Sequence, residues 1–96
     1  MSESIIAKHV MIEGRVQGVG YRAWTAGNAS KRGLAGWVRN RMDGSVEAVF
    51  QGSKEAVEAM IESCWSGPLV SKVTQVRVSD YPVDSAHTAF LRHPTE

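Results

Sequence analysis

A glycine-rich segment that joins an apolar run to a helix-compatible stretch constrains the fold of this chain most. The run Val10-Met11-Ile12 is typical of a strand, and glycines at positions 14, 18 and 20 follow it before Arg22. Glycine permits the backbone conformations of a tight loop whose N–H groups turn inward. The helix start that follows adds free N–H groups and the positive end of the helix dipole. The segment therefore predicts a small anion site, suited to a phosphoryl group, with Arg22 in the first helical turn beside it.

Apolar periodicity and turn residues divide the rest of the chain into further strands and one more helix. Asp43-Gly44 predicts a two-residue hairpin loop between two extended runs. Ser53 is a good N-cap for the second helix, and Gly67-Pro68 is a good end for it. An apolar stripe at helical spacing predicts the buried face of that helix: Val57, Met60, Ile61, Cys64 and Trp65. The expected strands are residues 5–13, 34–42, 45–51, 73–79 and 88–92, and the first helix is residues 21–32.

The resulting order is strand, helix, strand, strand, helix, strand, with a short tail strand. Right-handed crossovers fold such an order into an α+β, ferredoxin-like split βαβ sandwich. Both helices are expected to cover one face of a mainly antiparallel sheet. The 96 residues suffice for one domain, so we expect a single domain over residues 1–96, with residues 1–4 as a flexible tail.

Charge, cysteine content and hydropathy exclude several classes of protein. The formal net charge is +1, without the basic stripe typical of nucleic-acid or membrane-surface binding. The lone cysteine, Cys64, cannot form an internal disulfide. No apolar run approaches the roughly 20 residues of a membrane span, and the N-terminus lacks the features of a secretion signal. We therefore expect a cytoplasmic monomer with a small-molecule ligand and no nucleic-acid or membrane partner.

The histidines and arginines are further candidates for site residues. His9, His87 and His93 lack metal-ligand spacing, which favours ordinary surface or strand positions and predicts no metal. Four arginines lie in or beside the candidate site segments and predict a locally positive field there: Arg15, Arg22, Arg39 and Arg41.

Asn40 is the second candidate for a functional role. It lies within the expected strand 34–42, where asparagine is a poor fit. It stands three residues before the Asp-Gly turn, so it is not simply a turn residue. A strand amide beside an anion site favours a functional interpretation, and a solvent-facing edge position is the alternative.

Together these two segments resemble the acylphosphatase family. The first matches the family's Gly-x-Val-Gln-Gly-Val-x-(Phe/Tyr)-Arg signature at residues 14–22. The second matches its Gly-Trp-Val-x-Asn-x-x-Asp-Gly-x-Val-Glu signature at residues 36–47. Weaker similarity continues to Phe90, so the resemblance covers nearly the whole chain. Tyr21, where phenylalanine is commoner, and Gly27-Asn28 in the first helix are mild departures.

The resemblance implies a fold, a reaction and residue roles. The fold is the ferredoxin-like sandwich, and the reaction is hydrolysis of an acyl phosphate to a carboxylate and phosphate, with no cofactor. At the matching positions, the resemblance implies that Asn40 holds the attacking water and that Arg22 binds the phosphoryl oxygens. The loop N–H groups implied to assist Arg22 are those of Gln17, Gly18, Val19, Gly20 and Tyr21.

Two other functions stay open on the sequence. A ferredoxin-like domain would also serve to bind a phosphate-bearing ligand without hydrolysing it, although such a binder needs no water-orienting amide at Asn40. RNA-recognition modules share the order of elements. However, residues 45–50 lack the base-stacking aromatic pattern of those modules.

Overall fold

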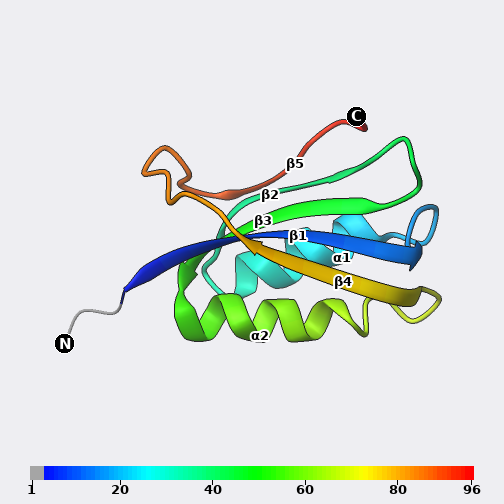
Figure 1. The fold of residues 1–96 in the computed structure, drawn as a ribbon, viewed down its shortest axis with the longest axis horizontal. Helices are drawn as coiled ribbons and strands as arrows, with labels where there is room; N and C mark the ends of the chain where they lie inside the picture. Colours follow the sequence, from blue (N-terminus) through cyan, green and yellow to red (C-terminus); the bar gives the residue numbers. More distant parts are fainter. Residues whose placement is uncertain (1–3) are drawn as a thin grey trace.

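The computed structural model describes residues 4–96, which form five strands and two helices (Figure 1). The elements are β1 (Ile5–Arg15), α1 (Tyr21–Lys31), β2 (Ala35–Asn40), β3 (Val46–Ser53), α2 (Lys54–Cys64), β4 (Lys72–Asp80) and β5 (Phe90–Arg92). The predicted order of elements is confirmed. Of the expected flexible tail, residues 1–3 lie outside the described residues, and Ser4 directly precedes β1.

The strands form one sheet in the order β4-β1-β3-β2-β5. β1 lies antiparallel to β3 and β4, β2 lies antiparallel to β3, and the short β5 runs parallel to β2. Both helices cover the same face of the sheet (Figure 1). This arrangement confirms the α+β, ferredoxin-like sandwich with a mainly antiparallel sheet.

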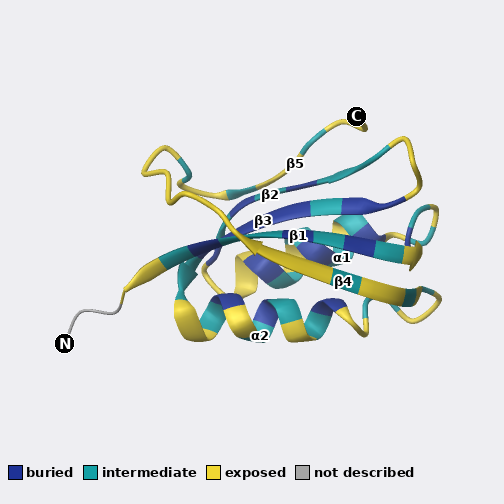
Figure 2. Cartoon of the chain, in the orientation of Figure 1, coloured by how far each residue is buried: buried dark blue, intermediate teal, exposed yellow. Residues whose placement is uncertain are grey.

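The core lies between the sheet and the two helices. β3 is buried along most of its length, whereas the edge strand β4 is mostly exposed (Figure 2). Alternate residues of the inner strands, such as Ile12, Val46 and Phe50, pack into one apolar cluster with Met60 of α2. Alternation places one face of each strand in this cluster and leaves the other face free for polar contacts.

The N-terminus of α2 is as predicted, but one end of its buried stripe is not. The Ser53 side chain accepts a hydrogen bond from the Ala56 N–H at 3.2 Å, as an N-cap does. Cys64 is fully buried, and this burial raises the pKa of its thiol to about 12, which fits a core residue. Trp65, however, is 47% exposed because the helix ends at Cys64 and Trp65 occupies the C-cap.

α1 has a weak apolar pattern and is held in place by a few specific contacts. Tyr21, Thr25 and Ala29 are buried on one side of the helix, and Trp24 packs at the edge of the core. The Tyr21 hydroxyl donates a hydrogen bond to the Cys64 carbonyl oxygen at 2.6 Å. This bond ties the first residue of α1 to the last residue of α2, and so fixes the helix start next to the glycine loop.

The hairpin between β2 and β3 differs from the prediction. A two-residue loop is wrong, because Asn40 pairs with Val46 and the Arg41 N–H donates to the Ser45 carbonyl oxygen at 2.8 Å. Three residues, 42–44, form the loop, and Gly44 closes it with a φ of 95°. Asp43 accepts hydrogen bonds from the Ser45 N–H at 2.9 Å and from its hydroxyl at 2.6 Å, which stabilises the turn.

No helix within residues 4–96 has the length and apolar character needed to cross a membrane.

Candidate active site

The glycine loop, the start of α1 and the end of β2 enclose a cavity of about 130 Å³. Arg22 and Asn40 both line this cavity, although they come from a helix and a strand. The other lining residues are Val16, Gln17, Gly18, Gly20, Tyr21, Ala23 and Arg92. The structure thus brings the two principal sequence candidates together at one site.

The loop conformation depends on two glycines. Gly18 and Gly20 have φ values of 73° and 80°, which L-residues with a side chain rarely adopt. A Cβ atom at either position would have open space, so backbone conformation rather than crowding requires glycine. Gly20 is also the N-cap of α1 and offers no side chain to cap the helix. In the described part of the chain, the backbone N–H groups of residues 17–20 have no hydrogen-bond acceptor.

Arg22 carries an unneutralised positive charge at the first turn of α1. Its Nη1 lies 3.5 Å from the His93 carbonyl oxygen, which is a long contact. No carboxylate within residues 4–96 forms an ion pair with its guanidinium, and no acidic residue lines the cavity. The adjacent Tyr21 points into the core, so only its backbone belongs to the loop surface.

Asn40 ends β2 on the side of the sheet that the helices cover. Every second residue of β2 faces this side, and these residues are Gly36, Val38 and Asn40. Val38 is fully buried. β2 is not an edge strand there, since the Glu96 N–H donates to the Asn40 carbonyl oxygen at 3.0 Å. Asn40 lines the cavity, and none of the side-chain hydrogen bonds within residues 4–96 involves its amide. The alternative of a solvent-facing edge position is therefore wrong.

The Gln17 side chain joins the loop to the β2–β3 hairpin. Its Nε2 donates hydrogen bonds to the carbonyl oxygens of Arg41 at 2.7 Å and of Ser45 at 2.8 Å. These carbonyls flank the hairpin directly after Asn40, so Gln17 holds the loop and Asn40 in a fixed relation. The sequence predicts only a backbone role for Gln17, because nothing local in a sequence identifies acceptors that distant along the chain.

Two residues differ from expectation in their relation to the cavity. Val19 is not among its lining residues and packs instead against the core cluster. Arg92, at the end of β5, lines the cavity, although the sequence predicts it only as part of a short strand. No sequence signal marked Arg92, since its place at the site depends on the pairing of β5 with β2.

The predicted positive field does not come from Arg39 and Arg41. These side chains lie around Glu47 and do not line the cavity: Arg39 Nε is 2.7 Å and Arg41 Nη1 is 3.4 Å from Glu47 Oε1. His9 Nε2 lies 2.6 Å from Glu47 Oε2. Burial alone would raise the pKa of Glu47, but the hydrogen bonds from His9 and Arg39 outweigh it and lower that pKa. The cationic groups that line the cavity are Arg22 and Arg92 instead.

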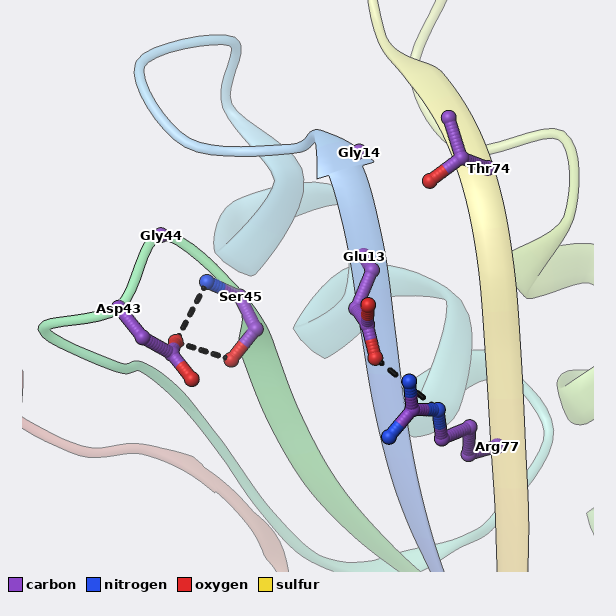
Figure 3. Close-up of a pocket in the computed structure, with 7 residues that line it drawn as sticks. All are labelled: Glu13, Gly14, Asp43, Gly44, Ser45, Thr74 and Arg77. Carbon is purple, nitrogen blue, oxygen red and sulfur yellow. Dashed lines mark hydrogen bonds and ion pairs between the residues drawn. The ribbon is translucent and has the colours of Figure 1, made fainter.

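A larger open cleft of about 460 Å³ lies between the hairpin and the ends of β1 and β4 (Figure 3). Its charged groups are already engaged: Arg77 Nε lies 3.1 Å from Glu13 Oε2, and Asp43 bonds to Ser45. None of the predicted site residues lines it. Residues 4–96 contain no group of three or more His, Cys, Asp or Glu side chains arranged to hold a metal ion.

Comparison with known proteins gives a consistent result. The sequence profile of the acylphosphatase family matches residues 8–91. The acylphosphatase of Nitrobacter winogradskyi is 55% identical over 87 residues, which cover 91% of this chain and 86% of that protein. The acylphosphatase of Rhodopseudomonas palustris is 59% identical over 76 residues, which cover 79% of this chain and 75% of that protein.

A solved structure agrees with these sequence relatives. The crystal structure of acylphosphatase from Bacillus subtilis superposes with a TM-score of 0.88 at 37% identity. The match covers 94% of this chain and 99% of that one.

Proposed function

This chain belongs to the acylphosphatase family, and from that premise we propose which of its residues carry the reaction. Acylphosphatases hydrolyse acyl phosphates, which are mixed carboxylic–phosphoric anhydrides, to a carboxylate and inorganic phosphate. In the proposal, Arg22 and the N–H groups of the loop over residues 17–21 bind the phosphoryl group. Asn40 orients the attacking water, and the whole chain acts as one domain.

The loop and Arg22 suit a phosphoryl group on chemical grounds. A guanidinium presents paired, planar N–H donors that match two phosphoryl oxygens, which a lysine ammonium does not. The N–H groups of residues 17–20 are unpaired within the described chain, and the first turn of α1 adds further donors without a side-chain cap. Together these donors are suited to stabilise the charge on the equatorial oxygens of a loose transition state.

Asn40 suits the placement of a water molecule. Its amide has both a donor and an acceptor, and none of the side-chain hydrogen bonds within residues 4–96 uses either of them. Because the transition state of phosphoryl transfer is loose, the nucleophile needs orientation more than deprotonation. An amide that neither gives up nor takes a proton is sufficient for that role.

The leaving group explains why so few residues are required. A carboxylate leaves with a pKa of about 4, so no general acid has to protonate it. An alkoxide from a phosphate monoester is a far poorer leaving group, and a site without an acid would not cleave it at speed. For the same reason we propose that the reaction requires no metal ion.

The observation that carries the proposal is that Arg22 and Asn40 line one cavity that no carboxylate shares. The test measures hydrolysis of benzoyl phosphate and of p-nitrophenyl phosphate in the presence of a strong metal chelator. We expect rapid hydrolysis of the acyl phosphate and little of the monoester. Equal rates on both substrates, or complete loss of activity with the chelator, would contradict the proposed mechanism. Binding of phosphate with no hydrolysis of either substrate would indicate a binding module instead.

A cytoplasmic location and a monomeric state complete the proposal. The single buried cysteine fits a reducing compartment, where disulfides are rare. Two neighbouring apolar side chains, Leu69 and Val70, are exposed between α2 and β4, so the monomer deserves a direct check. Light scattering coupled to size-exclusion chromatography should give a mass near 10.5 kDa, and a dimer mass would overturn this part. Cell fractionation tests the location.

A further inference from the structure

Arg92 is a second guanidinium at the candidate site, contributed by the C-terminal strand. It lines the same cavity as Arg22 and Asn40, and it is exposed at the end of β5. Within residues 4–96, neither a hydrogen bond nor an ion pair engages its side chain. A long cationic side chain without a partner is available to a ligand at no cost of breaking an existing contact.

The acidic residues on β3 and in the segment after β5 are engaged by a different arginine. Glu47 and Glu96 both pair with Arg39. Arg39 follows the buried Val38, so its side chain lies on the opposite face of β2 from the cavity. The cavity therefore has two guanidinium groups and no carboxylate among its lining residues. Two like charges at one small site repel each other until an anion neutralises them.

Backbone pairing places Arg92 next to the strand that carries Asn40. Arg92 is the register partner of Val38, and the His93 N–H donates to the Val38 carbonyl oxygen at 2.8 Å. Residues beyond β5 continue along β2, where the Met42 N–H donates to the Glu96 carbonyl oxygen at 3.0 Å. Before Arg92, the Gly36 N–H donates to the Ala89 carbonyl oxygen at 3.1 Å, so main-chain bonds hold the chain on both sides of Arg92.

We propose that Arg92 is a substrate-binding residue that, with Arg22, binds the doubly charged phosphoryl group of an acyl phosphate. This inference rests on the proposed function of the cavity. Two guanidinium groups match the two charges and the several acceptor oxygens of such a group. Arg92 lies on the exposed strand end and not on the preorganised loop, so it contributes to affinity more than to the chemical step.

The experiment compares Arg92→Gln with the wild-type protein on benzoyl phosphate, with inorganic phosphate as the inhibitor. We expect KM and the inhibition constant of phosphate each to rise about tenfold, as for the loss of one charge-assisted contact at an exposed position. We expect kcat to stay within about threefold. Lys54→Gln is the matched control, because it removes one positive charge at the start of α2, outside the cavity. Its constants should stay within twofold of wild type.

Two further variants keep the test decisive. If Arg92→Gln does not fold, Arg92→Lys retains the charge without the paired donors and should give a smaller rise in the phosphate constant. Phosphate inhibition unchanged from the Lys54→Gln control in both Arg92 variants, or a fall in kcat with unchanged KM, would overturn the inference. Asn40→Ala separates this inference from the proposed function. Full turnover in Asn40→Ala would refute the proposed function, whatever Arg92 does.

Discussion

Two groups of cationic side chains lie near the same end of the sheet, on opposite faces of β2 and β3. On the outer face, Arg39 and Arg41 lie around Glu47, which also bonds to His9. On the helix-covered side, Arg22 and Arg92 line a cavity without any acid. The first group is paired with carboxylates within the protein, and we expect it to stabilise the fold. The second has no carboxylate among the lining residues, and we propose that a ligand supplies its electrostatic complement.

This contrast explains why arginine content alone is a poor guide to the site. The four arginines of the two sequence signatures were expected to share one positive field. Alternation along β2 instead sends Arg39 to the face opposite that of Asn40, where Glu47 is its register partner. Whether an arginine near the site in sequence reaches the cavity depends on the face of its strand and on the strand register.

The largest effect is expected from Arg22→Ala. This variant removes the guanidinium that is proposed to bind the phosphoryl oxygens at the helix start. Loss of one preorganised donor group of this kind reduces turnover by about 10²–10³-fold. Steady-state hydrolysis of benzoyl phosphate measures the loss, and circular dichroism checks that the fold persists. Activity close to that of wild type would show that the unneutralised cluster is not the binding site.

Asn40→Ala should reduce kcat by about 10²-fold, because the water loses its orientation while the phosphoryl donors remain. Inhibition by inorganic phosphate should stay within about threefold of wild type. The ratio of the two effects distinguishes orientation of water from binding of phosphate. Equal loss of turnover and of phosphate affinity would contradict the division of roles between Asn40 and Arg22.

Glu47→Gln should act on the neutralised cluster and so on stability. The side chain of Glu47 is only 12% exposed, pairs with Arg39 and Arg41 and bonds to His9, so its loss should lower the free energy of unfolding by about 1–3 kcal/mol. Turnover should stay within a few-fold of wild type. Urea unfolding measures the change, with Glu58→Gln on the exposed face of α2 as a control that should change little.

The same variant should change the pH dependence of stability. The native contacts lower the pKa of Glu47, so their contribution is fully present above the ordinary carboxyl value of 4.5. It is lost as the pH falls below that value and through the lowered pKa of the folded state. Wild type should therefore lose more stability than Glu47→Gln between pH 7 and about pH 3. If the free energies of unfolding of the two proteins differ by the same amount at pH 7 and at about pH 3, the charge of Glu47 does not stabilise the fold.

The sequence predicted the order of the elements well because their signals are local. Periodic apolar residues, the Ser53 N-cap and the glycines of the loop each act over a few neighbouring residues. Arg22 and Asn40 were found through signatures that include those local features. The fold class followed from the same signals, whereas several strand ends differ from the expected ones by about two residues.

The remaining features depend on the strand register, which was not predicted correctly from the sequence. The predicted two-residue hairpin would pair Asn40 with Glu47, whereas the three-residue loop pairs Asn40 with Val46 and Arg39 with Glu47. The bonds from Gln17 to the hairpin carbonyls and the place of Arg92 are likewise long-range consequences of strand pairing. No short-range pattern around Gln17 or Arg92 encodes them.

A crystal structure with inorganic phosphate bound tests the central claim most directly. The account predicts phosphate in the cavity of the glycine loop, with its oxygens within hydrogen-bond distance of the Arg22 guanidinium and of the loop N–H groups. It also predicts the Asn40 amide within reach of the phosphate or of a water beside it. Phosphate bound in the open cleft at Glu13 and Arg77, or Asn40 too far away to contact either the ion or its water, would contradict the account.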